Sequence, residues 1–329
     1  MKKFLLVFIS LLTIIYAQQK VGNVGADFLS IPLLPEAMGM GGAYTAISSG
    51  ASSVFWNPSG TADVKGLELY TGYTMWFEDA RVPYISIVKS QGFYGNFGFF
   101  VSGFFSGDME EWTVEGPTGK TFNYNAYQVG LNYSRYFTDR FASGVSIKYV
   151  GENYGSISKT RGVAFDAGTV FNTGLYTIRL GMAFVNLGPD LKPSGEYIQY
   201  LYEGGQMNEY KRFYTSYPLP TTFRLGLAVD PYTSKFLKIT STFELLHPTD
   251  YNESFHCGIK FDFNNFYFST GYFLLIGERV IEEKFDEGGF SLGFGLNTKI
   301  KFGALKLSYS FNDMGILPFV HRLSLNFIY

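Results

Sequence analysis

The chain contains little of what defines several common protein classes. It has one cysteine, Cys257, among its 329 residues, so it forms no intramolecular disulfide. No run of about 20 apolar residues follows residue 17, which excludes a helical membrane protein beyond that point. The net charge of −2 leaves no basic excess of the kind that binds nucleic acid.

Motifs for phosphate binding, metal binding and catalysis are also missing. The glycine-rich run 39–42 lacks the Lys-Ser/Thr pair of a phosphate-binding loop. The histidines His247, His256 and His321 do not stand at zinc-site spacing with cysteines or carboxylates. The run 289–293 matches the nucleophile pattern G-x-S-x-G, but it continues in strict alternation, as a strand does. We therefore expect no enzyme, no cofactor and no metal.

The sequence is instead rich in aromatic residues and in alternating segments. It contains 34 Phe, 25 Tyr and 38 Gly, yet its mean hydropathy is only +0.04. Residues 322–329 place apolar side chains at alternate positions, which gives a strand one apolar and one mostly polar face. The same alternation recurs along most of the chain, for example over 141–150. Strands in which apolar and polar residues alternate one for one are typical of a transmembrane barrel.

About fourteen such strands follow residue 65, and short turns alternate with longer links between them. The turns are expected at 91–92, 138–139, 173–174, 264–265 and 297–298, and the longest links are 106–123, 188–217 and 275–288. Outer-membrane barrels have short periplasmic turns, longer external loops and an even strand number. The pattern predicts an all-β, transmembrane antiparallel β-barrel of about 14 strands. A soluble β-protein is the structural alternative.

The residues before the barrel divide into two parts. Residues 1–17 have a positive start, a short apolar stretch and Ala17 as a small residue for cleavage, which predicts a signal peptide rather than a membrane anchor. Residues 18–64 are rich in small residues, and we expect them to form an N-terminal hatch in the lumen of the barrel. Residues 65–329 then form the barrel, and the exported protein is expected in a Gram-negative-type outer membrane.

Three motifs stand in order before the barrel, namely Gly25-Ala26-Asp27-Phe28-Leu29, the Gly-Met-Gly-Gly-Ala-Tyr run at 39–44 and the Trp-Asn-Pro-Ser-Gly run at 56–60. In this order they resemble the PorV/PorQ family of outer-membrane proteins, within the wider FadL-like barrel group. Ser59 stands where the family's Asn-Pro-Ala signature has alanine. The resemblance implies a fourteen-stranded barrel with an N-terminal hatch.

The resemblance implies two alternative functions. PorV-like members imply a type IX secretion adaptor or porin-like component, with secretion-system components and their cargo as partners. FadL-like members imply uptake of a hydrophobic small molecule. We take the first as the leading prediction and the second as its alternative. The terminal Phe327 and Tyr329 resemble a barrel-assembly signal, which implies contact with the barrel-assembly machinery.

Two sets of residues are candidates for a role inside the barrel. The hatch and gate candidates are Met40, Gly41, Gly42, Trp56, Asn57 and Pro58. In this set Pro58 fixes a bend and Asn57 can hydrogen-bond local backbone, so the turn either anchors the hatch or gates a lateral opening. The lumen-facing charges are Lys148, Asp166, Arg179, Glu244 and Arg322. Because isolated charges away from water are costly, we expect these to pair across the lumen and hold the hatch, with permeant selectivity as the alternative.

Acidic residues cluster in two of the longest links. They are Asp108, Glu110, Glu111 and Glu115, and then Glu278, Glu282, Glu283, Asp286 and Glu287. Calcium prefers such oxygen ligands, so the clusters fit cation-bridged contact with lipopolysaccharide or a partner, or else plain solvated loops. Outer-membrane lipids and lipopolysaccharide are therefore expected partners of the barrel.

Overall fold

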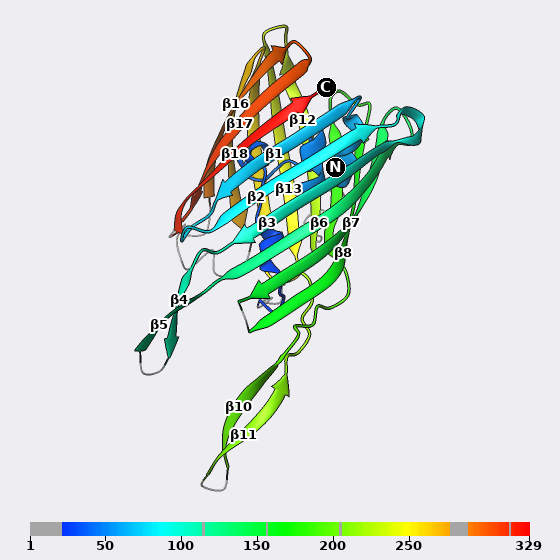
Figure 1. Ribbon diagram of the computed structural model, residues 1–329. Coiled ribbons are helices and arrows are strands. Elements are labelled where there is room, and N and C mark those ends of the chain that lie inside the picture. The colour runs from blue at the N-terminus through cyan, green and yellow to red at the C-terminus, as the bar shows by residue number, and fades with distance from the viewer. Residues whose placement is uncertain (1–21, 114–115, 156, 204–205, 277–288, 316) are drawn as a thin grey trace, which may run out of the picture.

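Fourteen antiparallel strands form a closed ring (Figure 1). The structure is a computed structural model and describes residues 22–113, 116–155, 157–203, 206–276, 289–315 and 317–329. Neighbouring strands pair in the order β1-β18-β17-β16-β15-β14-β13-β12-β9-β8-β7-β6-β3-β2, and β2 pairs with β1 to close the ring. The predicted all-β antiparallel barrel and its strand number are confirmed.

The strands are mostly longer than average, and the helices are short. The barrel strands are β1 (Leu67–Met75), β2 (Arg81–Ser90), β3 (Asn96–Phe105), β6 (Tyr124–Tyr136), β7 (Phe141–Tyr154), β8 (Ser158–Asn172), β9 (Arg179–Leu187), β12 (Thr222–Thr233), β13 (Leu237–Pro248), β14 (Ser254–Phe263), β15 (Phe266–Leu275), β16 (Gly289–Ile300), β17 (Gly303–Met314) and β18 (Leu317–Ile328). The helical turns are η1 (Asp27–Ser30), α2 (Pro35–Met38), η2 (Ala51–Phe55), η3 (Pro58–Asp63) and η4 (Gly92–Tyr94). Within the described ranges no helix has the length and apolarity to cross a bilayer.

Alternation along each strand sorts side chains between the inside and the outside of the ring. In β7 the side chains of Ser146, Lys148 and Val150 are buried, whereas Val145 and Ile147 are 51% and 47% exposed. The polar and small residues therefore face the lumen, and the large apolar residues face outward. This is the reverse of a soluble barrel, which hides its apolar face inside.

The two ends of the barrel differ. The end at Tyr329 carries short turns, and we call it the turn end. The opposite end carries two hairpins that project away from the ring, β4–β5 (Met109–Thr113, Gly116–Phe122) and β10–β11 (Glu196–Glu203, Gln206–Phe213), and we call it the hairpin end (Figure 1). Two of the three long links expected as loops thus contain two-stranded ribbons. Most of the third link, with the second acidic cluster, lies outside the described residues.

The turn predicted at 297–298 is wrong. Asn297 and Thr298 lie within β16 and continue its ladder opposite Lys306 and Leu305. The chain turns at residues 301–302 instead, before Gly303, whose φ of 149° belongs to a region that favours glycine. The Asn-Thr pair was misread because its residues are common in turns, while cross-strand pairing decided the outcome.

Residues 22–66, which we call the N-terminal segment, run through the inside of the ring (Figure 1). The segment makes hydrogen bonds with β2, β6, β8, β13, β14, β17 and β18. Because these strands are spread around a closed ring, a segment that reaches all of them lies in the lumen. A role as a hatch stays a prediction, and the predicted signal peptide 1–17 lies outside the described residues.

The wall lacks side chains where the N-terminal segment approaches most closely. A Cβ atom added at Gly144 would lie 2.4 Å from the Pro58 carbonyl oxygen. One added at Gly271 would lie 2.1 Å from the carbonyl carbon of Met40. Neither distance is tolerated between real atoms, since close-packed interiors leave no room for an extra methyl group. Glycine at these wall positions therefore admits the backbone of the N-terminal segment.

Gly144→Ala is expected to destabilise the folded protein by about 1–3 kcal/mol, because the new methyl group overlaps the backbone at Pro58. Chemical denaturation measures the free energy of unfolding. Gly22→Ala makes the same chemical change where nothing lies within 4 Å, and it is the matched control. Equal stability of the two variants would contradict close packing of the N-terminal segment against β7.

Candidate functional site

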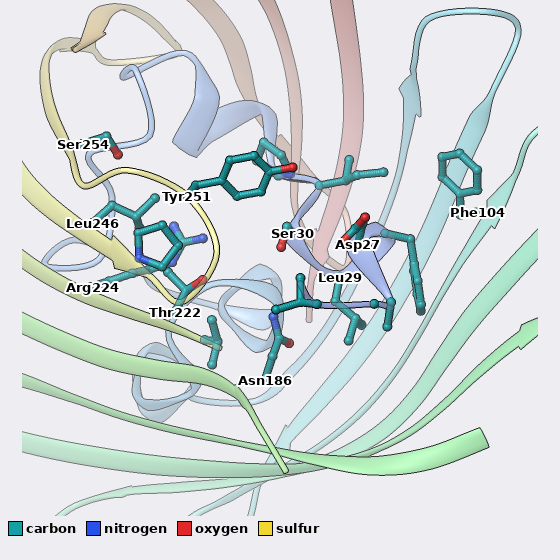
Figure 2. A pocket seen from close by; sticks show the side chains of 18 of the residues that line it. Asp27, Leu29, Ser30, Phe104, Asn186, Thr222, Arg224, Leu246, Tyr251 and Ser254 are labelled. Carbon is teal, nitrogen blue, oxygen red and sulfur yellow. The ribbon is translucent and has the colours of Figure 1, made fainter. Parts of the chain in front are cut away.

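A cavity of about 840 Å³ lies at the hairpin end, between the wall and residues 24–32 of the N-terminal segment (Figure 2). It opens at this end of the barrel, and a polar space of about 30 Å³ lies on the other side of residues 29–32. Most of its lining is apolar, and much of it is aromatic. The aromatic side chains are Phe28, Trp76, Phe104, Tyr124, Tyr154, Tyr217, Tyr251 and Phe273.

The floor of the cavity is fixed on one side of the barrel. Ala26, at the start of η1, adopts a left-handed conformation with φ of 56°, and the Gly25 amide donates to the Pro218 carbonyl oxygen at 3.1 Å. The side chains of Ala26 and Phe28 then pack into a buried cluster with Val150, Ala164, Leu191 and Leu219. This contact holds η1 against β7, β8 and the connection between β9 and β12.

The wall beside the floor contains a β-bulge. The pairing of β8 with β9 shifts register between Phe165 and Ala167, and Val185 and Asn186 of β9 both line the cavity. Asn186 has φ of 62°, and its backbone amide donates to Asp166 Oδ1 at 2.7 Å. A bulge re-aims side chains at the cost of a ladder hydrogen bond, and here a carboxylate satisfies the freed amide.

Three of the predicted lumen charges pair with neighbouring strands and not across the lumen. Lys148 Nζ lies 2.8 Å from Asp166 Oδ1 and donates to Asn186 Oδ1 at 2.5 Å. Arg179 pairs with Asp230 of β12 at 2.6 Å, toward the turn end. The prediction of pairing across the lumen is therefore wrong for these residues, because adjacent strands offered a partner at shorter range.

The other two predicted charges bind the N-terminal segment. Glu244 of β13 is 2% exposed and accepts hydrogen bonds from the amides of Tyr44 and Thr45, at 2.9 and 2.8 Å. The Thr45 hydroxyl donates to the second oxygen of the same carboxylate at 2.8 Å. Arg322 of β18 is fully buried, and its Nε donates to the Pro32 carbonyl oxygen at 2.7 Å. These groups anchor the segment through its backbone.

Arg224, which the sequence reasoning did not single out, connects the anchor at Glu244 to the cavity. Its guanidinium lies 4.0 Å from the ring centre of Trp56 and 3.7 Å from Glu244. The same side chain lines the cavity (Figure 2). Stacking on an indole and a nearby carboxylate together stabilise this buried charge.

The predicted hatch and gate residues lie below the cavity rather than in its lining. The amide of Asn57 donates to the carbonyl oxygens of Thr45 and of Thr169 in β8, so it ties the segment to itself and to the wall. Trp56 donates from Nε1 to the Thr45 hydroxyl, and Pro58 begins η3. The Gly41 carbonyl lies 2.6 Å from His256 Nδ1.

Met40 and Gly42 complete this set. The Met40 backbone lies against the wall glycines Gly258 and Gly271, and Gly42 takes a positive φ of 86° beside His256. All six candidates are thus buried between segment and wall, and their role as a gate stays a prediction.

Carboxylates lie in and beside the cavity, which the sequence reasoning missed. Asp27 lines the cavity (Figure 2). Glu152 of β7, 1% exposed, accepts hydrogen bonds from the hydroxyls of Tyr124 and Tyr217, each at 2.5 Å. Burial raises the pKa of Asp27, and the negative charges of Asp250 and Glu152 raise it further. These carboxylates come from the N-terminal segment, β7 and the β13–β14 connection, so only the fold brings them together.

The remaining sequence candidates lie elsewhere. Phe327 pairs with Leu69 and Leu305 on the two neighbouring strands, and Tyr329 is 75% exposed at the turn end. Ser291 of the G-x-S-x-G run lies in β16 and donates to the Gly271 carbonyl oxygen. In the part of the chain that the structure describes, no group of three or more acidic, histidine or cysteine side chains could hold a metal.

Glu244→Gln is expected to release the N-terminal segment locally. The glutamine side chain replaces one acceptor oxygen by a donor, and it leaves the Arg224 charge without its carboxylate. Hydrogen exchange of the Tyr44 and Thr45 backbone amides should therefore accelerate about a hundredfold. Hydrogen exchange with mass spectrometry measures this. Asp230→Asn weakens ion pairs of the wall alone, with Arg179 and Lys238, and should leave these amides protected. Unchanged protection in Glu244→Gln would contradict the anchor.

No protein-family model matches the chain, and no curated protein matches its sequence. Solved structures do match. They include the CymD monoaromatic hydrocarbon channel (TM-score 0.57, 11% identity, 90% of this chain and 97% of that chain) and the Pseudomonas putida toluene transporter TodX (0.54, 12%, 88% and 95%). A Pseudomonas aeruginosa FadL homologue also matches (0.54, 12%, 91% and 99%). At this identity the similarity shows a shared barrel fold. The FadL-like part of the resemblance is confirmed at the level of fold, whereas the PorV/PorQ assignment stays a prediction.

Proposed function

We propose that this barrel lies in an outer membrane and takes up hydrophobic small molecules, the alternative that the sequence left open. The cavity of about 840 Å³ with its mostly apolar lining carries the proposal. Ligand sites are concave, apolar and of about 300–1,000 Å³, with few polar groups that orient the ligand. The fold is shared with structures described as a monoaromatic hydrocarbon channel and a toluene transporter, which supports the same class of cargo.

The outer surface supports the membrane location. Outward-facing side chains of successive strands are large and apolar, for example Phe99 of β3, Leu131 of β6 and Ile147 of β7, which are 44%, 60% and 47% exposed. A closed ladder satisfies its backbone hydrogen bonds internally, which the hydrocarbon region of a bilayer requires. The hairpin end then faces outside the cell and the turn end faces the periplasm, as in other outer-membrane barrels.

Movement of the N-terminal segment is required for passage beyond the cavity. Residues 29–32 line both the large cavity and a polar space of about 30 Å³ directly below it, which is bounded also by Trp56 and Lys148. Such a space holds about one or two water molecules and no aromatic ring. A bound molecule therefore passes beyond the cavity only when residues 29–32 or the adjoining wall at the β9 bulge shift.

Val185→Trp is expected to weaken binding of toluene to the purified protein at least about tenfold, because the indole would occupy the cavity next to the bulge. Isothermal titration calorimetry in detergent measures the affinity. Ile147→Trp adds the same side chain on the outer face and is the matched control. Toluene binding that is absent in the unaltered protein, or equal in both variants, would contradict the proposed cargo site.

A secretion-linked role is the second candidate, and the two projecting hairpins favour it. On β10–β11 the side chains of Tyr200, Tyr202 and Met207 are 57%, 73% and 64% exposed, as a protein-binding ribbon requires. We expect a pull-down of the mature protein from its native outer membrane to recover hydrophobic small molecules. Recovery of secretion components or proteins with a shared C-terminal domain, lost on deletion of 196–213, would favour the adaptor instead.

A further inference from the structure

We propose that the cavity selects its cargo by charge and takes hydrophobic amines in preference to hydrophobic carboxylates, with neutral molecules between the two. The inference deepens the proposed function and rests on it. It concerns the charge of the side chains around an apolar cavity that is large enough for an aromatic molecule.

The negative charge comes from three elements: Asp27 lines the cavity, and the buried Asp250 and Glu152 lie near it. Asp27 extends from η1 into the cavity, opposite Tyr251 of the β13–β14 connection (Figure 2). Among the described residues, the Asp27 side chain makes no ion pair or hydrogen bond. Asp250 is 4% exposed, and Glu152 lies behind the rings of Tyr124 and Tyr217.

Asp27 lies in a negative electrostatic environment. Burial raises its pKa, and the charges of Asp250 and Glu152 raise it further, so these two carboxylates repel the charge of Asp27. An ammonium group beside Asp27 would relieve that repulsion, whereas a carboxylate would add to it. Low-dielectric walls focus such a field into the cavity.

The aromatic side chains supply a second attraction. Trp76, Phe104, Tyr124 and Tyr154 line the cavity near η1. The hydroxyls of Tyr124 and Tyr154 donate to Glu152 Oε1 at 2.5 and 3.4 Å, which fixes the two rings. Ring faces attract an ammonium group and bind apolar groups, so one lining serves both halves of an aromatic amine.

Among the described residues that line the cavity, one carries a positively charged side chain, and it does not offset this charge. Arg224 lies deeper, stacks on Trp56 at 4.0 Å and faces Glu244 at 3.7 Å. Its positive charge is thereby largely compensated before any cargo enters. An anionic molecule in the cavity would be repelled by Asp27, which lines the same space.

Three probes with the same 4-butylphenyl body and different charge test the inference on the purified full-length protein, namely 4-butylbenzylamine, 4-butyltoluene and 4-butylbenzoate. Titration calorimetry at pH 7 should show the amine binding about tenfold more tightly than the benzoate. In Asp27→Asn the ratio of amine to butyltoluene affinity should fall about fivefold. In Asp27→Lys the benzoate should bind more tightly than the amine.

Asp139→Asn is the matched control, since Asp139 lies 86% exposed in the turn between β6 and β7 and should leave every ratio unchanged. Equal affinity for the three probes, or ratios unaltered by both Asp27 variants, would overturn charge selection while leaving the proposed function intact. Failure of butyltoluene and of both charged probes to bind would overturn the proposed function and the inference together.

Discussion

Closure of the strand ladder is the constraint on which the rest of this structure depends. β18 pairs with β1 over eight residues, so the first and last barrel strands meet and no wall strand is left with an open edge. A ring of fourteen strands encloses more space than its own inward side chains fill. The lumen must therefore hold water, a channel or another part of the chain, and here it holds the N-terminal segment.

The fit between segment and wall uses two physical devices. Glycines such as Gly144 and Gly271 let backbone pack directly on backbone, which brings polar groups of the segment within reach of wall side chains. Buried polar side chains, above all Glu244, Arg322 and Asn57, then satisfy the carbonyl and amide groups of a segment with little secondary structure of its own. Buried backbone groups without hydrogen bonds would be costly, so these contacts fix one position for the segment in the lumen.

The cavity lies where the close packing between the N-terminal segment and the wall ends. Between Gly25 and Pro32 the segment packs against β7, β8 and the connection after β9, and it leaves the opposite side of the hairpin end open. The short β9, with its bulge at Asn186, and the aromatic side chains of β3, β6 and β7 shape the space that remains. Apolar lining suits a hydrophobic cargo, and Asp27 with the carboxylates near it adds the proposed preference among such cargoes.

The sequence by itself determined the class of fold. Period-two alternation placed Ser146 and Lys148 inside and Val145 and Ile147 outside, and the absence of long apolar runs left strands as the only route to a membrane. The alternation predicted the orientation of these side chains correctly, because each residue's polarity by itself indicates whether it faces the lumen or the outside. Short turns such as 138–139 were predicted correctly, because residue preferences in a tight turn are also local. The turn predicted at 297–298 was wrong, because strand pairing with β17 outweighed the local preference there.

Only the tertiary structure decided the candidate site. The sequence placed Lys148 and Asp166 in the lumen, but not that they pair with each other, since partner choice depends on strand neighbours and register. It carried no local signal for the meeting of Asp27, Glu152 and Asp250, which are separated by about a hundred residues or more at each step. Residues so distant become neighbours only when the ring closes around the N-terminal segment, because the shape of a cavity is a property of packing and not of local sequence.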